Sequence, residues 1–295
     1  MRPEDVIERV WPSRSFEYEP LGGGITNRNF LVRVGGERFV LRIGGKDTEL
    51  LGIDRAREGA AARMAASISV GPEVVAVLRP EGFLVTRFID GDPIPPERLK
   101  DPDMLALVAA SVRAIHDGPA IPGRFDPHRV VQRYAETAAQ HGVRVPDDYA
   151  WGKEISDRIE AARGPQQLVP CHDDLLNANF IFDGERVRIG DWEYAGMGDR
   201  FFDLGNLSVK HDFARDDDER LLEAYLAAPP GDRDLAAVGL MRFMGAFFEA
   251  MWGVVQQGIS ELDFDFVAYA SDNFDRLHAI ATAPEFDGWL DEVGR

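Results

Sequence analysis

Residues Val169 to Asn206 read VPCHDDLLNANFIFDGERVRIGDWEYAGMGDRFFDLGN, and the interpretation of the whole chain starts from them. Two apolar runs in this segment flank the dipeptide Asp183-Gly184, a pattern that predicts a β-hairpin. Because a hairpin brings the chain back to where it started, the loop before it and the residue after it should lie side by side. We therefore expect Asp174, Asn179 and Asp191 to lie within reach of one another.

An Asp, an Asn and a second Asp at this spacing are the groups that phosphoryl transfer requires. The transferred phosphate carries charge that Mg²⁺ neutralises, Mg²⁺ prefers oxygen ligands, and the accepting hydroxyl needs a carboxylate to take its proton. In protein kinases the catalytic Asp is followed five residues later by a metal-binding Asn and, after the next strand pair, by a metal-binding Asp. The same order predicts Asp174 as the catalytic base, with Asn179 and Asp191 as metal ligands. The alternative is a hairpin whose polar loop residues only cap turns.

The sequence resembles a known family at these residues. His172-x-Asp174-x-x-x-x-Asn179, Asp191-Trp192-Glu193-Tyr194 and the segment from Phe202 to Asn206 resemble the choline/ethanolamine kinase branch of the aminoglycoside-phosphotransferase-like enzymes. The resemblance extends from about Leu21 to about Leu277. It implies an α+β, bilobal protein-kinase-like fold, with a small N-terminal lobe built on an antiparallel sheet and a larger, mainly helical C-terminal lobe. It also implies that ATP and Mg²⁺ are the cofactors.

The predicted elements agree with two lobes. Residues 16–21, 28–34 and 38–43 have the composition of strands separated by glycine turns, residues 54–66 are expected to form a helix, and residues 83–89 form another apolar strand. The breaker cluster Gly91-Asp92-Pro93 follows, and helical periodicity dominates afterwards. We expect a nucleotide-binding lobe at residues 1–90 and a C-terminal lobe with the catalytic loop and acceptor pocket at residues 91–295.

A glycine-rich break from Gly22 to Asn27 separates the first two predicted strands. Backbone N–H groups in such a turn can approach phosphate oxygens, because glycine has no Cβ. The break lacks the Walker and dinucleotide patterns, and a plain turn is the alternative. The resemblance implies that it is the nucleotide-phosphate loop, with contacts from Gly23, Gly24, Ile25, Thr26 and Asn27.

Further nucleotide contacts follow from the resemblance. Arg42 matches the nucleotide-binding arginine of choline kinases, and Glu58, on the following helix, is the acid that orients it. Thr86, Arg87 and Phe88 are candidates for the connecting strand whose backbone meets the adenine ring. If each residue is considered alone, Arg42 and Glu58 could also be ordinary surface charges.

The acceptor pocket is implied by the segment from Phe247 to Ala270, which resembles the C-terminal segment of choline kinases. It supplies Trp252 and Tyr269, and Tyr194 adds a third aromatic residue, for a cage that would bind a cationic head group. Aromatic residues at helical spacing also form ordinary hydrophobic cores, so a core is the alternative.

Two residues depart from the choline kinase pattern. Glu249 stands where eukaryotic choline kinases have a second tryptophan, and Lys210 stands where they have an acid. A lysine near a bound cation is unfavourable unless it pairs with Glu249 or points away. A carboxylate with fewer aromatic faces suits a primary ammonium, which donates hydrogen bonds. Ethanolamine is therefore as good a candidate as choline.

Composition limits the partners. The chain of 295 residues has 51 acidic and 33 basic residues, for a net charge of −18. Such a charge repels nucleic acid and anionic membranes and could steer a cationic alcohol inward, although it could equally serve solubility.

The start of the sequence has no signal-peptide pattern and no apolar run is long enough to span a membrane, so we expect a cytoplasmic protein. The single cysteine, Cys171, excludes an internal disulfide and is expected to be a small packing residue. The sequence does not predict the oligomeric state.

These observations predict an ATP- and Mg²⁺-dependent kinase that phosphorylates the hydroxyl group of a small amino alcohol of the choline or ethanolamine type. The nearest alternative is the same chemistry on an aminoglycoside, a sugar or a hydroxy amino acid. More remote alternatives are a metal-dependent phosphohydrolase built on His116-Asp117 and His172-Asp173, and a nucleotide-binding module without catalysis.

Overall fold

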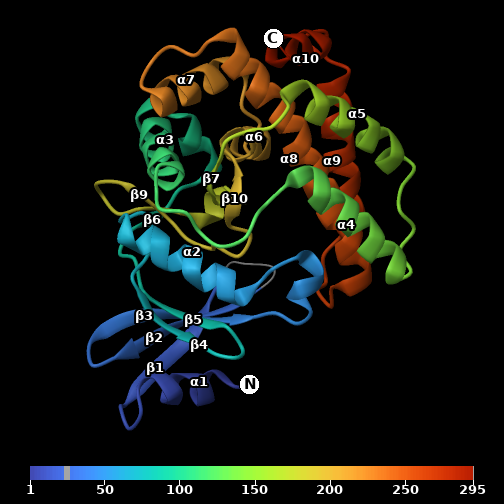
Figure 1. The fold of residues 1–295 in the computed structure, drawn as a ribbon. Helices are drawn as coiled ribbons and strands as arrows, with labels where there is room; N and C mark the ends of the chain where they lie inside the picture. The colour runs from blue at the N-terminus through green and yellow to red at the C-terminus, as the bar shows by residue number, and fades with distance from the viewer. Residues whose placement is uncertain (23–26, 295) are drawn as a thin grey trace.

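The computed structural model describes residues 1–22 and 27–294. Figure 1 shows a twisted sheet with two helices in the N-terminal part and a larger group of helices in the C-terminal part, with the two termini at opposite ends of the molecule. This arrangement confirms the predicted α+β, protein-kinase-like class. The exact lobe boundary, between residues 90 and 91, stays a prediction.

The N-terminal sheet has five antiparallel strands in the order β1-β2-β3-β5-β4. The strands are β1 (Phe16–Leu21), β2 (Asn27–Val34), β3 (Glu37–Gly44), β4 (Val74–Leu78) and β5 (Phe83–Arg87). Four of them match strands expected from the sequence. β4 was not predicted, because it is an edge strand whose residues are only partly buried and show no clean alternation of apolar and polar side chains.

Two helices cover the two faces of this sheet. Successive side chains of a strand point to opposite faces, so Phe83 and Val85 join the core beneath α1 (Pro3–Val10). Leu84, between them, joins the core that α2 (Arg55–Ser67) shares with the C-terminal part. α2 therefore lies between the sheet and the large helical part (Figure 1).

The C-terminal part is mainly helical, as predicted. Its α-helices are α3 (Pro102–His116), α4 (Pro127–Gln140), α5 (Asp148–Arg163), α6 (Arg200–Lys210), α7 (Arg215–Leu226), α8 (Asp232–Ile259), α9 (Phe266–Ala281) and α10 (Phe286–Val293). Short 3-10 helices occur at η1 (Thr48–Leu51), η2 (Pro96–Lys100) and η3 (Asn177–Asn179). Helix α6 begins at Arg200, because Asp199 caps it by accepting a 3.0 Å hydrogen bond from Phe201 N.

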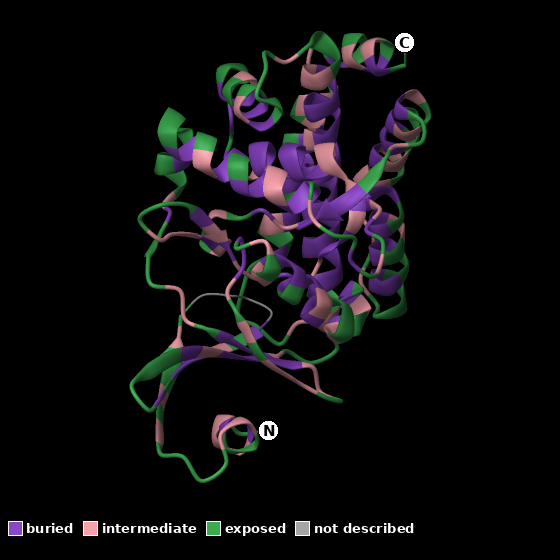
Figure 2. Ribbon diagram, turned by 60° about the vertical axis from the view of Figure 1, so that its left-hand side comes forward, coloured by how far each residue is buried: buried purple, intermediate pink, exposed green. Residues whose placement is uncertain are grey.

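Helix α8 forms the centre of the helical part. It is long and apolar enough to cross a membrane, but 94% of its most apolar window is buried inside the protein. Figure 2 shows the buried residues concentrated where the helices of this part pack together. The composition of α8 is thus that of a core helix.

The predicted hairpin is present as β8 (Phe180–Phe182) and β9 (Val187–Ile189). Its connection is longer than the two-residue turn expected, because Asp183 Oδ1 accepts hydrogen bonds from the N–H groups of Glu185 and Arg186 and forms a wider loop. β6 (Asp92–Pro93) pairs with β8, and β7 (Leu168–Cys171) pairs with β10 (Gly196–Asp199). These pairings hold the segments before and after the hairpin next to each other, as expected.

The close crossing of α6 and α8 gives the first prediction. A Cβ atom on Gly205 would lie 2.6 Å from the backbone carbon of Met241 and 2.7 Å from the nitrogen of Arg242. We expect Gly205→Ala to lower the free energy of unfolding by about 2–3 kcal/mol, because backbone atoms of α8 cannot move aside cheaply. Gly288→Ala is the matched control: a Cβ there meets nothing within 4 Å, so alanine should be neutral or stabilise α10 by about 0.5 kcal/mol. Urea denaturation measures both, and an unchanged midpoint for Gly205→Ala would contradict the close crossing.

Candidate active site

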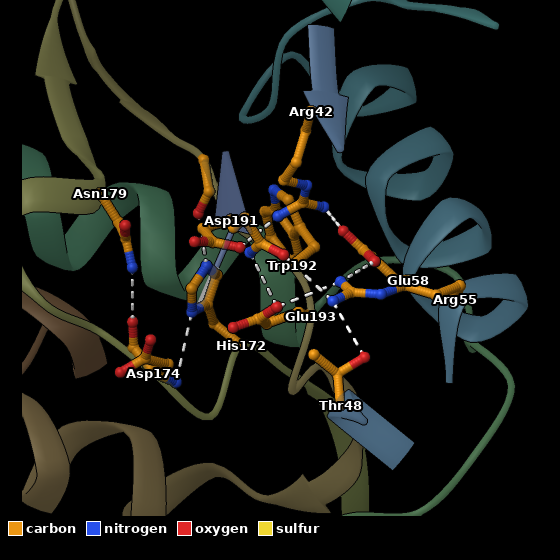
Figure 3. A network of polar contacts seen from close by, with 12 residues as sticks. Arg42, Thr48, Arg55, Glu58, His172, Asp174, Asn179, Asp191, Trp192 and Glu193 are labelled. Carbon is orange, nitrogen blue, oxygen red and sulfur yellow. Dashed lines mark hydrogen bonds and ion pairs between the residues drawn. The ribbon is translucent and has the colours of Figure 1, made fainter. Parts of the chain in front are cut away.

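His172 ties the catalytic loop to the end of the hairpin. Its Nε2 donates a 2.8 Å hydrogen bond to Gly190 O, and its Nδ1 accepts one of 3.3 Å from Asp174 N. Because a carbonyl can only accept and an amide N–H can only donate, this pairing assigns the proton to Nε2. Figure 3 shows the ring between Asp174 and the residues that follow the hairpin. Both ring nitrogens of His172 thus support the loop through hydrogen bonds.

Asp203 lies beneath the same loop. Its carboxylate accepts the N–H groups of His172 at 2.8 Å and of Asp173 at 2.7 Å, and His116 Nε2 donates to it at 3.1 Å. The side chain is fully buried. Burial alone would raise the pKa of Asp203, but the hydrogen bond from His116 and the other donors lower it overall. Asp203 is therefore ionised and holds the loop in place through these hydrogen bonds.

His116, Cys171 and Asp203 form a compact buried cluster whose potential ligand atoms lie within 4.8 Å of one another. The polar atoms of this cluster already serve the brace, since His116 bonds to Asp203 and to Tyr225 Oη. Burial raises the pKa of the Cys171 thiol well above its usual range, which fits a packing residue. His116 and His172, the two histidines of the phosphohydrolase alternative, thus hold the loop in place, and their positions do not support a phosphohydrolase.

Two acidic residues near the site have left-handed backbone conformations. Asp173 has a φ of 67° and Asp191 a φ of 58°. Such conformations are uncommon outside glycine and cluster at functional sites. Burial also raises the pKa of Asp173 well above its usual range. The backbone thus turns sharply on both sides of the predicted base and metal ligands.

Asn179 and Asp191 are adjacent, as the hairpin predicted. Gly190 N donates to Asn179 O at 2.9 Å, and Asn179 Nδ2 donates to Asp174 O at 3.1 Å. The second bond orients the amide so that its oxygen faces away from the Asp174 carbonyl (Figure 3). An amide oxygen and a partly exposed carboxylate are the hard donors that a divalent cation such as Mg²⁺ prefers, so these residues could hold one.

Arg42 connects the sheet to this group. It forms ion pairs with Glu58 on α2 and with Asp191 (Figure 3). Its side chain is 9% exposed and that of Glu58 is 1% exposed, which rules out the alternative of ordinary surface charges. The structure therefore brings Arg42 and Glu58 together at the position expected for them.

A second network, which the sequence did not reveal, joins the two parts of the chain. Arg55 Nη1 contacts Glu193 Oε2 at 3.1 Å and Glu58 Oε2 at 2.7 Å. Asn27 donates to the same Glu193 oxygen at 2.9 Å, and its own Oδ1 accepts from Arg55 at 3.0 Å. Burial raises the pKa of Glu193 to about 7, and the neighbouring Asp191 acts in the same direction. Asn27, expected to contact nucleotide, thus has its side chain in this network.

A cavity of about 240 Å³ lies between the sheet and the catalytic loop. Its lining includes the predicted residues Arg42, Thr86 and Phe88, together with Asn29, Leu84, Ile89, Asn179 and Asp191. The N–H of Phe88 donates to Arg38 O at 3.0 Å and that of Arg87 donates to Glu73 O at 2.9 Å. Hydrogen bonds from Arg87 and Phe88 to the base of a nucleotide would therefore use their carbonyl groups or side chains. The predicted loop residues Gly23, Gly24, Ile25 and Thr26 lie outside the described residues.

A second cavity, of about 430 Å³, adjoins the first. Its lining includes five residues predicted for the acceptor side, Asp174, Tyr194, Glu249, Trp252 and Tyr269. The two cavities share Ala178, Asn179 and Asp191 in their linings. The predicted metal ligands thus lie at the junction of the two cavities, and the predicted base faces the second one.

Aromatic residues of α8 and α9 form one wall of the second cavity. Trp252 Nε1 donates to Tyr194 Oη at 3.0 Å, and the Trp252 and Tyr269 rings meet edge to face with centroids 5.6 Å apart. Tyr269 Oη donates to Glu249 Oε2 at 2.5 Å. The expected cage residues are therefore together, although their polar groups bond to one another.

Lys210, the last residue of α6, enters the same cavity. Its Nζ lies 2.5 Å from Asp174 Oδ1 and 2.8 Å from Glu249 Oε1. Burial alone would lower the pKa of Lys210, but the charges of Asp174 and Glu249 raise it above its usual range. The sequence left open whether Lys210 points into the pocket, and the structure shows that it does.

Among the described residues, the polar and charged side chains near the site that the sequence did not reveal include Arg55, Glu193, Asn273 and Arg276. Asn273 and Arg276 line the second cavity from α9. They follow Tyr269 by four and seven residues, which places all three on one helix face, so this spacing was the available signal. Glu193 is only two residues from Asp191, whereas Arg55 had no local signal.

Comparisons with known proteins agree with this geometry. Residues 17–238 match the family described as "Phosphotransferase enzyme family". The chain is 27% identical over 306 residues to ethanolamine kinase 2 of Homo sapiens, a match that covers 92% of this chain and 77% of that protein.

Solved structures give the same result. A choline/ethanolamine kinase family protein from Mesorhizobium loti superposes with a TM-score of 0.85 and 33% identity, covering 99% of this chain and 98% of that one. Choline kinase LicA from Streptococcus pneumoniae, at 21% identity, shares the fold with a TM-score of 0.77, covering 94% of this chain and 99% of that one. The chain therefore belongs to the phosphotransferase enzyme family, in its choline/ethanolamine kinase branch, and is a small-molecule kinase with an alcohol group as acceptor.

Proposed function

We propose that this protein catalyses the ATP- and Mg²⁺-dependent phosphorylation of the hydroxyl group of a small amino alcohol. The observation that carries the proposal is the junction of two cavities at Asn179 and Asp191, with Asp174 facing the second cavity. One cavity would hold the nucleotide and the other the acceptor, so that the transferred phosphoryl group passes between them. The proposed location is the cytoplasm, where ATP is available.

The first cavity has the features of a nucleotide site. Its apolar lining, which includes Val40, Leu84 and Ile89, suits a base, and Arg42 stands at its inner end beside Asp191. A guanidinium offers paired donors to phosphate oxygens. LicA, which has the same fold with a TM-score of 0.74, has been solved in complex with AMP, and this supports the assignment.

Asn179 and Asp191 would hold Mg²⁺. Their oxygen donors match the preference of this ion, and they lie between the two cavities. The ion would supply positive charge that neutralises the phosphate oxygens during transfer. Arg42 remains beside Asp191 and keeps that carboxylate oriented toward the junction.

Asp174 is the base of the proposed reaction. Its carboxylate accepts the proton of the substrate hydroxyl, whose oxygen then forms a bond to the γ-phosphorus while the bond from that phosphorus to the β,γ-bridging oxygen breaks. The products are ADP and a phosphate monoester. His172 and Asp203 keep the loop in place during this step through the hydrogen bonds described above.

The acceptor side favours a small molecule with one amine. Trp252 and Tyr269 present aromatic surface to the cavity, which can stabilise an ammonium group by roughly 0.5–2 kcal/mol per face. A polycationic aminoglycoside suits the cavity less well, because Asp174 and Glu249 already pair with Lys210 and the lining also carries the guanidinium of Arg276. A small amino alcohol is therefore the better match.

Replacing the base tests the proposed mechanism. Asp174→Asn should lower kcat by roughly 10²–10⁴, because an amide cannot accept the hydroxyl proton, while KM for Mg-ATP stays within about twofold. Asp157→Asn, on the exposed side of α5, is the matched control and should retain full activity. ADP release and thermal unfolding measure the effect. Activity above a third of wild type in a folded Asp174→Asn variant would refute this role.

Metal removal tests the proposed cofactor. EDTA should abolish acceptor-dependent ADP release, and added Mg²⁺ should restore it, because the phosphate charge would otherwise remain unscreened. Asn179→Ala should raise the Mg²⁺ concentration needed for half-maximal activity by at least about tenfold, because one oxygen ligand is lost. A titration of Mg²⁺ at saturating ATP measures this shift. Full activity in EDTA would contradict the proposal.

A further inference from the structure

Every described carboxylate in the lining of the acceptor cavity contacts a cationic side chain of the protein itself. Among the described lining residues, the carboxylates are those of Asp174, Asp191, Glu193 and Glu249. Asp191 pairs with Arg42 and Glu193 pairs with Arg55, both from the N-terminal part. The remaining two carboxylates share the ammonium group of Lys210. Each lining carboxylate therefore has a cationic partner within the protein.

Glu249 is the carboxylate that would otherwise attract a cationic substrate. Its Oε1 lies 2.8 Å from Lys210 Nζ, and its Oε2 accepts a 2.5 Å hydrogen bond from Tyr269. Its side chain is only 8% exposed and that of Lys210 only 10% exposed, so water screens this pair weakly. A substrate ammonium therefore gains much less from Glu249 than it would from a carboxylate without a partner.

Arg276 is the lining charge that is held most weakly. Its Nη2 lies 3.6 Å from Asp212 Oδ1, and the two side chains are 42% and 72% exposed. An exposed ion pair of this kind contributes little. Its Nη1 contacts Asn273 Oδ1 at 3.5 Å. The guanidinium therefore keeps donor capacity for a ligand in the cavity, and a carboxylate is the group that it binds best.

We propose that the acceptor carries a carboxylate in addition to its hydroxyl and ammonium groups, so that the substrate class is a hydroxy amino acid. In this arrangement Arg276 binds the carboxylate, the aromatic surfaces of Trp252 and Tyr269 contact the ammonium group, and Asp174 receives the hydroxyl. Lys210 determines the preference, because it pairs with Glu249 and so reduces the attraction of that carboxylate for a cationic substrate. This inference rests on the proposed kinase function, and for its acceptor it selects the hydroxy amino acid that the sequence left as an alternative.

The first test compares acceptors that differ by a carboxylate. Serine is ethanolamine with a carboxylate on the amine-bearing carbon, and carnitine is choline with a carboxymethyl group on the hydroxyl-bearing carbon. ADP release is measured with the full chain and Mg-ATP for all four compounds. We expect kcat/KM to be about tenfold or more higher for the carboxylated member of at least one pair, as expected for one added ion pair in a partly desolvated site.

Arg276→Gln tests the proposed carboxylate contact. It should raise KM for the carboxylated acceptor about tenfold more than KM for its uncarboxylated partner, because only the former loses an ion pair. Arg158→Gln is the matched control, since this guanidinium lies on α5 and pairs with Asp287 away from the cavity. The control should leave both KM values unchanged.

Lys210→Met tests the residue that determines the preference. Because Lys210 also contacts Asp174, its effect is measured by binding and not by turnover. Isothermal titration calorimetry with Mg-AMP-PNP present should show that the variant binds ethanolamine or choline about tenfold more tightly than the wild type does, and the carboxylated partners no more tightly. Lys153→Met, a replacement of a partly buried lysine on α5 that pairs with Asp157, should leave all four affinities unchanged.

The outcomes separate the two proposals. A wild-type preference for ethanolamine and choline over both carboxylated partners overturns the inference and leaves the kinase function intact. Equal KM effects of Arg276→Gln on both members of a pair also overturn it, and this result remains decisive if Lys210→Met does not fold. Phosphorylation of no alcohol at all, by a protein that binds Mg-ATP, overturns the proposed function together with the inference.

Discussion

The hydrogen bonds that Asp203 accepts from the catalytic loop are the interaction on which the site depends. An ionised carboxylate is costly to bury unless donors surround it, and here the donors are two backbone N–H groups of the loop and the ring of His116. The loop in turn contains Asp173, whose φ of 67° lies in a region that is uncommon outside glycine and carries some backbone cost. The charged acceptor offsets that cost. Its ionisation and the loop conformation therefore support each other, and the direction of Asp174 follows from both.

A second constraint joins the sheet to this loop. Glu193 is 6% exposed and receives hydrogen bonds from Asn27 and Arg55. Arg55 also contacts Glu58, which pairs with Arg42. One chain of buried polar contacts thus runs from Arg42 on the sheet to Glu193, two residues after Asp191. The relative position of the two proposed substrate cavities depends on this chain, because Arg42 belongs to one cavity and Glu193 to the other.

Local patterns predicted most of the fold and part of the site. The spacing of Asp174, Asn179 and Asp191 around a hairpin was enough to bring these residues together, because hairpin geometry is determined within a few residues. Arg55 and Glu193 could not be found in this way, since 138 positions separate them and no periodicity encodes an ion pair over that distance. The edge strand β4 was not predicted for another reason: its residues are only partly buried, so its sequence shows no alternation of apolar and polar side chains. Ion pairs between distant segments and partly buried edge strands thus could not be predicted, because they depend on tertiary packing.

The acceptor cavity shows why two departures from the choline kinase pattern must be interpreted together. Considered alone, a lysine at position 210 would be a buried cation beside a cationic substrate, and a glutamate at position 249 would be an added anion. The structure places the two groups 2.8 Å apart. Removing one member of a buried pair leaves an uncompensated charge that costs several kcal/mol, so each residue makes the other tolerable. Relative to a pocket with an acid and a tryptophan at these positions, the pair makes the lining one unit less negative. The pair therefore supports the proposed acceptor, because it makes the lining less negative without replacing Asp174, Asn179 or Asp191.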